Sequence, residues 1–249
     1  HQDGHSQILA NTYPNLKSYD PAFAYELVVI VREGIRRMYE QQENIFYYLT
    51  AYNENYLMPS MPKTKDVAQK IAAGGYLLSS TKKESESEIH LLGSGSIMQQ
   101  VLNARDLLEE KGFAVSVWSI TSYNELLRDA EQCERENRLH PFAKAVTPYI
   151  EKLFKNTSGS YVAASDYMKI FANGIAPWMP EYFTALGTDG YGLSESRADL
   201  REYFEISPAY ISHAALVGLY KLGKLDAAQL QRHIESLNID PAKTNPMHH

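Results

Sequence analysis

The sequence has little cysteine, no long apolar stretch and no excess of positive charge. Cys133 is the only cysteine among 249 residues, which excludes an internal disulfide and a zinc site made of cysteine alone. No apolar run approaches the roughly 18 residues of a membrane-spanning helix, so we expect no membrane contact. Acidic residues outnumber basic ones by 30 to 24, which argues against a nucleic-acid-binding protein. The scarcity of cysteine fits a reducing compartment such as the cytoplasm.

The remaining composition is that of an ordinary globular protein. Apolar residues make up 44% and charged residues 22% of the chain, and 249 residues suffice for one large or two small domains. The chain begins with His1 instead of methionine. We therefore expect it to be a piece of a longer protein.

Strands and helices alternate from about residue 75 to 222. The clearest unit spans residues 88–120, where a strand ends in the glycine-rich residues 93–96, an amphipathic helix follows and a second strand begins at Phe113. Such a unit has parallel strands. The sequence thus predicts an α/β fold with a mostly parallel sheet sandwiched by helices. The other expected strands are 75–79, 161–164 and 183–186, and the other expected helices are 66–73, 122–138, 167–176, 195–204, 208–222 and 226–237.

A smaller piece precedes this unit. Residues 1–24 are polar and turn-rich, a helical pattern starts at Tyr25, and residues 45–51 are typical of a buried strand. Pro59 and Pro62 interrupt regular structure, so a domain boundary is expected within residues 52–66. The charged stretch 80–88 is expected to be a loop tip.

Residues 93–96, Gly-Ser-Gly-Ser, allow three interpretations. They are a tight strand-to-helix turn capped by serine, or a site for a phosphate or carboxylate at a helix start, or part of a nicotinamide-cofactor site. The last is opposed by Met98, which stands where the dinucleotide motif needs glycine, and by the lack of an acid at the end of the next strand.

The opening residues His1, Asp3 and His5 also allow three interpretations. Alternating as strand residues would, they could share one face and bind zinc, or line an active-site loop that moves protons near neutral pH, or form a solvated loop. The glycine-rich residues 187–192 and the following serines are interpreted mainly as a loop and a helix start. Cys133 lies among acidic residues, which disfavours a nucleophilic thiolate.

Eight segments together resemble one known family. The sequence resembles the C-terminal part of the homodimeric, bacterial-type pyruvate dehydrogenase decarboxylase component, a thiamine-diphosphate enzyme, over essentially all 249 residues. In chain order, the segments are HQDGHSQ, SYDPAFAYEL, NENYLMPSMP, LLGSGSI, SYNELLRDAEQCERENRLHP, ASDYMKIFA, LGTDGYGLSESRADLREYFEI and NIDPAKTNP.

The resemblance implies a three-domain subunit. Residues 1–62 would be the tail of the middle, pyrimidine-binding α/β domain, and residues 63–249 the transketolase-like C-terminal domain. It implies thiamine diphosphate and Mg²⁺ as cofactors, a second copy of the chain as partner, and acetyl transfer to a dihydrolipoyl acetyltransferase. The family's cofactor-protonating glutamate and metal-binding motif do not occur here, so we expect this chain alone to bind neither cofactor and to be inactive.

The resemblance also assigns roles at the N-terminus. The histidine matching His1 would be catalytic, near the reacting carbons, and Asp3 and His5 would lie on the substrate side. Gln7 departs from the histidine that the family often carries there. The C-terminal domain would hold no catalytic group, and the alternative hypothesis is that the whole chain is only a structural and dimerisation module.

Overall fold

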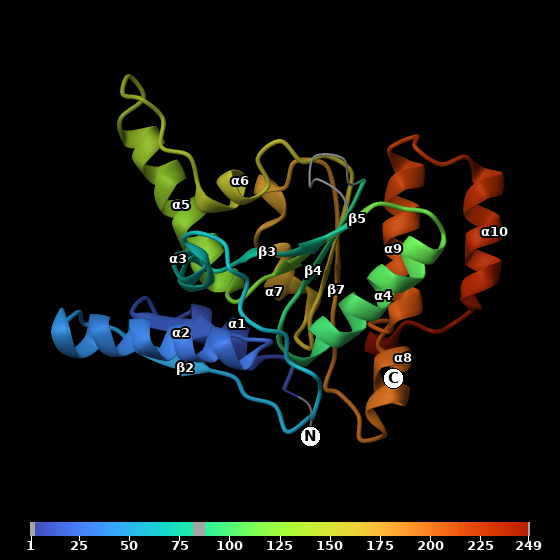
Figure 1. Ribbon diagram of the computed structural model, residues 1–249, viewed down its shortest axis with the longest axis horizontal. Helices are drawn as coiled ribbons and strands as arrows, with labels where there is room; N and C mark the ends of the chain where they lie inside the picture. Colours follow the sequence, from blue (N-terminus) through green and yellow to red (C-terminus); the bar gives the residue numbers. More distant parts are fainter. Residues whose placement is uncertain (1–2, 82–87, 249) are drawn as a thin grey trace.

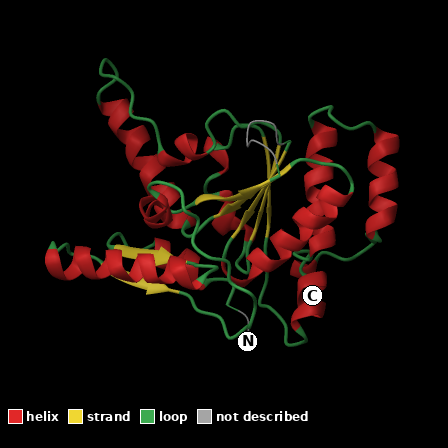
Figure 2. Ribbon diagram, viewed as in Figure 1, coloured by secondary structure: helices red, strands yellow, loops and turns green. Residues whose placement is uncertain are grey.

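Two sheets organise the computed structural model, which describes residues 3–81 and 88–248 (Figures 1 and 2). The larger sheet has five strands in the order β3-β5-β4-β6-β7. β4, β5, β6 and β7 run parallel, and β3 pairs antiparallel with β5 at one edge. The predicted mostly parallel α/β sheet is confirmed. The strands are β3 (Tyr76–Ser80), β4 (Ile89–Gly93), β5 (Val115–Ser119), β6 (Ser160–Ala164) and β7 (Tyr182–Leu186).

The strand-helix-strand unit predicted over 88–120 is present. β4 leads into α4 (Met98–Glu110), and β5 returns beside β4 in parallel register, with Ile89 opposite Val115. Gly112 ends the turn after α4 with φ of +89°, a backbone conformation that glycine adopts without steric cost. This is the predicted glycine stop.

Helices cover both faces of this sheet because successive strand residues point to opposite sides. Ile89 and Leu91 belong to one buried cluster, whereas Leu92 belongs to another. The first cluster is covered by α4, α9 (Pro208–Lys221) and α10 (Ala227–Leu237), and the second by α5 (Tyr123–Leu139), α6 (Tyr149–Leu153) and α7 (Lys169–Asn173) (Figure 1).

The N-terminal residues form a separate two-stranded parallel sheet. Its strands are β1 (Leu16–Tyr19) and β2 (Phe46–Leu49), and α1 (Ser6–Asn11), α2 (Ala24–Ile35) and α3 (Val67–Ala73) lie around it. The polar, turn-rich residues 1–24 showed no helix or strand pattern in the sequence, yet α1 and β1 form there. Both pack on helices of the larger unit: α1 contacts α7, and β1 contacts α5.

Several expected elements differ in extent. The helix expected over 167–176 is only α7, the one expected over 195–204 is α8 (Arg197–Tyr203), and the strand expected over 45–51 is only β2. The charged stretch 80–88 falls largely on residues 82–87, outside the described residues. Within the described parts of the chain, no helix combines the length and apolar character needed to cross a membrane.

Candidate functional site

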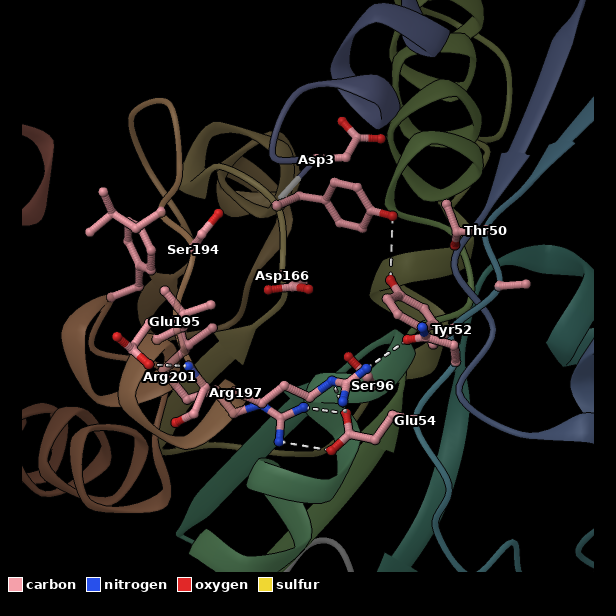
Figure 3. A pocket seen from close by; sticks show the side chains of 18 of the residues that line it. Asp3, Thr50, Tyr52, Glu54, Ser96, Asp166, Ser194, Glu195, Arg197 and Arg201 are labelled. Carbon is pink, nitrogen blue, oxygen red and sulfur yellow. Dashed lines mark hydrogen bonds and ion pairs between the residues drawn. The ribbon is translucent and has the colours of Figure 1, made fainter. Parts of the chain in front are cut away.

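A cleft of about 860 Å³ opens at the carboxyl ends of the strands (Figure 3). It is lined by residues 48–54 after β2, the turn after β4, residues 166–167 after β6, and part of residues 193–206 around α8. Asp3 also lines it. Ligands of open α/β sheets bind at this edge, where loops from different strands meet. We therefore take this cleft as the candidate functional site.

Ion pairs join the two sides of the cleft. Arg201 on α8 binds both carboxylate oxygens of Glu54, at 3.0 Å for the Nη1–Oε1 pair. Arg197 Nη2 donates to Asn53 Oδ1 at 2.6 Å, and its Nε lies 3.8 Å from Glu54 Oε2. The two-pronged geometry of Arg201 fixes α8 against the chain that follows β2.

Asp166 points into the centre of this cleft (Figure 3). Burial, followed by the nearby charge of Asp20, raises the pKa of Asp166 to about 6, and Arg201 acts in the opposite direction. A carboxyl group with such a pKa exchanges its proton near neutral pH, as general acids and bases must. Asp166 is therefore the described side chain in the cleft best suited to hold or release a proton.

The N-terminal loop contributes Asp3 to the cleft but not His5. The Asp3 carboxylate accepts the backbone N–H groups of Ser6 at 2.9 Å and His5 at 3.2 Å. Burial alone would raise the pKa of Asp3, but the hydrogen bonds from Ser6 and His5 outweigh it and lower that pKa. His5 is exposed, and His1 lies outside the described residues.

The zinc interpretation of this loop finds no support in the described part. Asp3 and His5 do not lie in a strand, because the chain bends at residues 4–5 and enters α1 at Ser6, while His1 is outside the described residues. Among residues 3–81 and 88–248, no group of three or more His, Cys, Asp or Glu side chains could hold a metal ion.

A second group of acidic residues lies buried between the two sheets, and we call this contact the seam. Asp20, directly after β1, accepts hydrogen bonds from three hydroxyl groups: Thr50 at 2.6 Å, Tyr52 at 2.5 Å and Ser94 at 2.7 Å. Complete burial raises the pKa of Asp20, and the three hydrogen bonds oppose this. Because Ser94 belongs to the turn after β4, Asp20 ties the N-terminal residues to the large sheet.

This contact decides what the Gly-Ser-Gly-Ser turn does. Gly95 has φ of +49°, and a Cβ there would lie 2.6 Å from Asp20 Oδ1 and 2.5 Å from the Tyr52 hydroxyl. The expected tight strand-to-helix turn is present, but Ser94 makes no side-chain cap to the helix, so the serine cap itself is wrong. The group seated at the turn is a carboxyl, and it belongs to the chain itself.

Glu26 on α2 is the second acidic residue of the seam. Its carboxyl accepts the N–H groups of Ala22 at 2.6 Å and Phe23 at 3.1 Å, at the start of its own helix. It also accepts the hydroxyls of Tyr76 on β3 and Ser119 on β5, at 2.7 and 2.6 Å. Burial raises the pKa of Glu26, against the effect of these four donors.

Gln7, where the family often has histidine, also lies in the seam. Its side chain is fully buried, and the side-chain Nε2 donates to the Tyr19 backbone carbonyl at 3.3 Å. The backbone carbonyl of Gln7 accepts a hydrogen bond from Asn124 Nδ2 of α5 at 2.9 Å. Gln7 thus joins α1 to β1 and α5 and does not line the cleft.

The remaining sequence candidates are structural. Burial, then the negative charge of Asp129, raises the pKa of the Cys133 thiol, in line with the expectation that it is no nucleophile. Ser196 caps α8 by accepting the N–H of Asp199 at 3.2 Å, as the predicted helix start requires. Asp189 in the glycine-rich loop accepts the N–H of Lys169 at 2.9 Å.

Sequence reasoning missed most of the charged groups that define these sites, namely Asp20, Glu26, Glu54, Asp166, Arg197 and Arg201. Asp20 and Glu26 did carry a signal, since they are the acidic residues of the otherwise mainly apolar and aromatic stretch 19–31. An acid in such a stretch is buried only with partners.

Residues 74–207, more than half of the chain, match the family model described as the transketolase-like C-terminal domain. The chain belongs to this family. Residues 1–59 match a second model, the middle domain of the pyruvate dehydrogenase E1 component. The resemblance to bacterial pyruvate dehydrogenase found from the sequence is thereby confirmed.

Individual relatives agree with the family models. The pyruvate dehydrogenase E1 component of Pseudomonas aeruginosa is 45% identical over 99% of this chain, which spans only 28% of that relative's length. Transketolase of Pichia stipitis has the same fold, with a TM-score of 0.61 at 16% identity, over 91% of this chain and 28% of that one. A split-gene transketolase chain, described as an inactive beta4 tetramer, superposes with a TM-score of 0.56 at 18% identity. There, the match covers 88% of this chain and 63% of the other.

Proposed function

We propose that this chain is part of a bacterial-type pyruvate dehydrogenase. The longer protein would decarboxylate pyruvate with thiamine diphosphate and pass the acetyl group to lipoamide on a dihydrolipoyl acetyltransferase, as a homodimer in the cytoplasm. The observation that carries this proposal is the 45% identity along 99% of the chain to an E1 component three to four times longer.

Two domains would contribute to this chain, divided at residues 62 and 63. The two separate sheets support the division, as do the ranges of the two family models, 1–59 and 74–207. The first part would be the tail of the pyrimidine-binding middle domain, and the second the C-terminal domain.

The described residues do not fit thiamine diphosphate or Mg²⁺. The glycine-rich turn at residues 93–96, which resembles a diphosphate-binding turn, is filled by the Asp20 carboxyl, and the described parts of the chain contain no cluster of metal ligands. We propose that other parts of the longer protein hold the cofactor and its metal, and that this chain alone is inactive.

Within the longer protein, His1 would be catalytic, with Asp3 and His5 on the substrate side. Proton transfer at an imidazole near neutral pH is the chemistry that His1 offers. The place of Asp3 in the lining of the cleft supports this assignment, and its carboxylate also holds the start of α1 by accepting the N–H of Ser6.

The test is the His1→Ala variant of the full-length protein, compared with His140→Ala as a control. His140 is an exposed histidine at the end of α5, paired with Glu136. We expect His1→Ala to lower turnover by about 100-fold with unchanged circular dichroism, since one positioned proton-transfer group contributes about 10²–10⁴-fold. Unchanged turnover would remove His1 from the active site.

Calorimetric titration of the 249-residue chain with thiamine diphosphate and Mg²⁺ tests the placement of the cofactor. We expect no heat of binding, because the turn that could receive the diphosphate is occupied by Asp20. Full-length protein titrated in parallel serves as the positive control. Micromolar binding by the 249-residue chain would contradict the proposal.

A further inference from the structure

The main chain of Gly4, between Asp3 and His5, is held by two loops of the large sheet. Its carbonyl accepts the N–H of Met168 at 3.0 Å. A Cβ on Gly4 would lie 3.0 Å from the carbonyl oxygen of Thr188, so only glycine fits without a shift. Gly4 is buried, although its two neighbours are exposed. The N-terminal loop is therefore gripped by its backbone, while its side chains stay accessible.

The two loops that hold Gly4 are locked to each other. They are residues 165–169 after β6 and residues 187–189 after β7, and we call them the loop clamp. The N–H of Thr188 donates to the Tyr167 carbonyl at 2.9 Å. Asp189 accepts the N–H of Lys169 at 2.9 Å and pairs with its ammonium group at 3.0 Å.

The two loops can approach each other this closely only because residue 187 is glycine. A Cβ there would lie 2.2 Å from the Tyr167 carbonyl oxygen, and backbone atoms cannot yield as a side chain would. Three residues of the LGTDG segment thus have a definite place in the clamp, since Gly187 allows the close approach and Thr188 and Asp189 make the contacts.

A second anchor lies just beyond the loop. Asn124 of α5 donates to the carbonyl of Gln7, and the Ile8 side chain packs into the core cluster beneath α5 and α7. Residues 4 and 7 are thus both fixed by the large unit. The segment between them, with Asp3 immediately before it, cannot shift unless one of these contacts opens.

We infer that the loop clamp positions the HQDGH loop for the reaction, so that the transketolase-like C-terminal domain takes part in catalysis through backbone contacts. This inference rests on the proposed function, which places His1 at the reacting carbons. Met168, Gly187, Thr188 and Asp189 are positioning residues, because they touch the loop or each other and do not line the cleft.

The clamp is tested first in the 249-residue chain, by hydrogen exchange of Gly187→Ala and of Gly174→Ala as the matched control. A Cβ at Gly174 would lie 3.2 Å from the Leu127 side chain, which can yield, and 3.5 Å from the Phe171 carbonyl oxygen, which is an ordinary van der Waals contact. We expect the amides of residues 5–9 to exchange about five- to tenfold faster in Gly187→Ala than in the control, in line with losing one hydrogen bond. Equal exchange would overturn the inference without bearing on the proposed function.

A second set of variants distinguishes loss of the clamp contact from a general folding defect, which Gly187→Ala could also cause. Asp189→Ala removes the acceptor of the Lys169 N–H, Asp189→Asn keeps an oxygen there, and Lys169→Met removes only the ion pair. We expect Asp189→Ala to speed exchange at residues 5–9, and Asp189→Asn and Lys169→Met to stay near wild type. If all three behave alike, the clamp does not act through this backbone contact.

Activity of the full-length protein separates the two proposals. If the loop clamp positions the HQDGH loop, Asp189→Ala lowers kcat severalfold with little change in the KM for pyruvate, because the loop shifts while the pyruvate-binding surface is unchanged. Asp189→Asn is expected to keep kcat near the wild-type value. A purely structural role would lower the yield or stability of the protein and leave kcat unchanged, which overturns the inference. If His1→Ala retains full turnover, the proposed function fails, whatever the exchange data show.

Discussion

The seam and the cleft both gather carboxyl groups from the N-terminal residues and the strand ends, yet they differ in what surrounds these groups. In the seam, Asp20 and Glu26 are buried, and each accepts at least three hydrogen bonds from the chain itself. In the cleft, Glu54 and Asp166 face arginines and open volume. Hydroxyl donors close the first site, whereas the second keeps room for a ligand.

This difference shows why a sequence motif alone does not establish a binding site. The glycine-rich turn has the position of an anion site, but the Asp20 carboxyl of the chain itself lies against it and accepts the Ser94 hydroxyl. No ligand-binding motif of known chemistry marks the cleft, but its carboxylate and guanidinium groups meet at an edge where ligands bind.

The largest effect is expected from Asp20→Ala. The buried hydroxyl of Ser94 and the partly buried hydroxyls of Thr50 and Tyr52 would lose their acceptor. We therefore expect the free energy of unfolding to fall by about 3–5 kcal/mol in urea denaturation. The control is Asp106→Ala, at an exposed residue of α4 that pairs with its neighbour Arg105. If Asp20→Ala lowers the free energy of unfolding by less than Asp106→Ala does, the hydrogen bonds of Asp20 in the seam contribute nothing to stability.

An intermediate effect is expected from Asp166→Asn, and it depends on pH. Because the folded-state pKa of Asp166, about 6, exceeds the usual 3.8, the folded protein keeps this proton longer than the unfolded chain. The wild type therefore loses stability as pH rises from about 4 to about 6, and the variant does not. The gap should reach about 2–3 kcal/mol at pH 7.

Thermal or urea unfolding of both proteins between pH 4 and pH 7 measures this gap, with Asp106→Asn as the control for an exposed carboxylate. Parallel stability curves for Asp166→Asn and wild type would show that Asp166 is hydrated like a surface group. The contrast between Asp166, which titrates in the cleft, and Asp20 and Glu26, which are hydrogen-bonded within the seam, would then be wrong.

The smallest effect is expected from Glu54→Gln. Its ion pair with Arg201 is partly exposed, so we expect a loss of about 1 kcal/mol or less, fading at 1 M salt. A double-mutant cycle with Arg201→Gln isolates the pair. A coupling as large as the Asp20→Ala effect would mean that the cleft is packed as tightly as the seam.

The sequence predicted the elements whose stability is largely local. The unit around α4 shows its helix period, its glycine stop and its apolar strands within about 33 residues, and it folds as expected. The sequence did not predict α1 and β1, because both are short and depend on partners far away in the chain. For example, Arg128 of α5 donates hydrogen bonds to the backbone carbonyls of Leu16 and Tyr13. No local pattern encodes such contacts.

The same reason explains what was missed in the sites. Asp20 meets Ser94, which is 74 residues away, and Glu26 meets Ser119, which is 93 residues away. Glu54 meets Arg201 across 147 residues. Sequence alone places an acid near a strand or helix start, but only the fold decides which distant hydroxyl or guanidinium group it reaches.

The hydroxyl partners of Glu26 have a consequence for how the chain unfolds. Tyr76 lies on the edge strand β3 of the large sheet and Ser119 on the neighbouring strand β5, whereas Glu26 lies on α2, a helix beside the small sheet. If either the small sheet with α2 or the large sheet unfolded alone, the Glu26 carboxyl or the Tyr76 and Ser119 hydroxyls would lose their hydrogen-bond partners. Two parts that match different family models thus share one cooperative transition, and a cut at the proline-rich connection would divide the covalent chain but not the unit of stability.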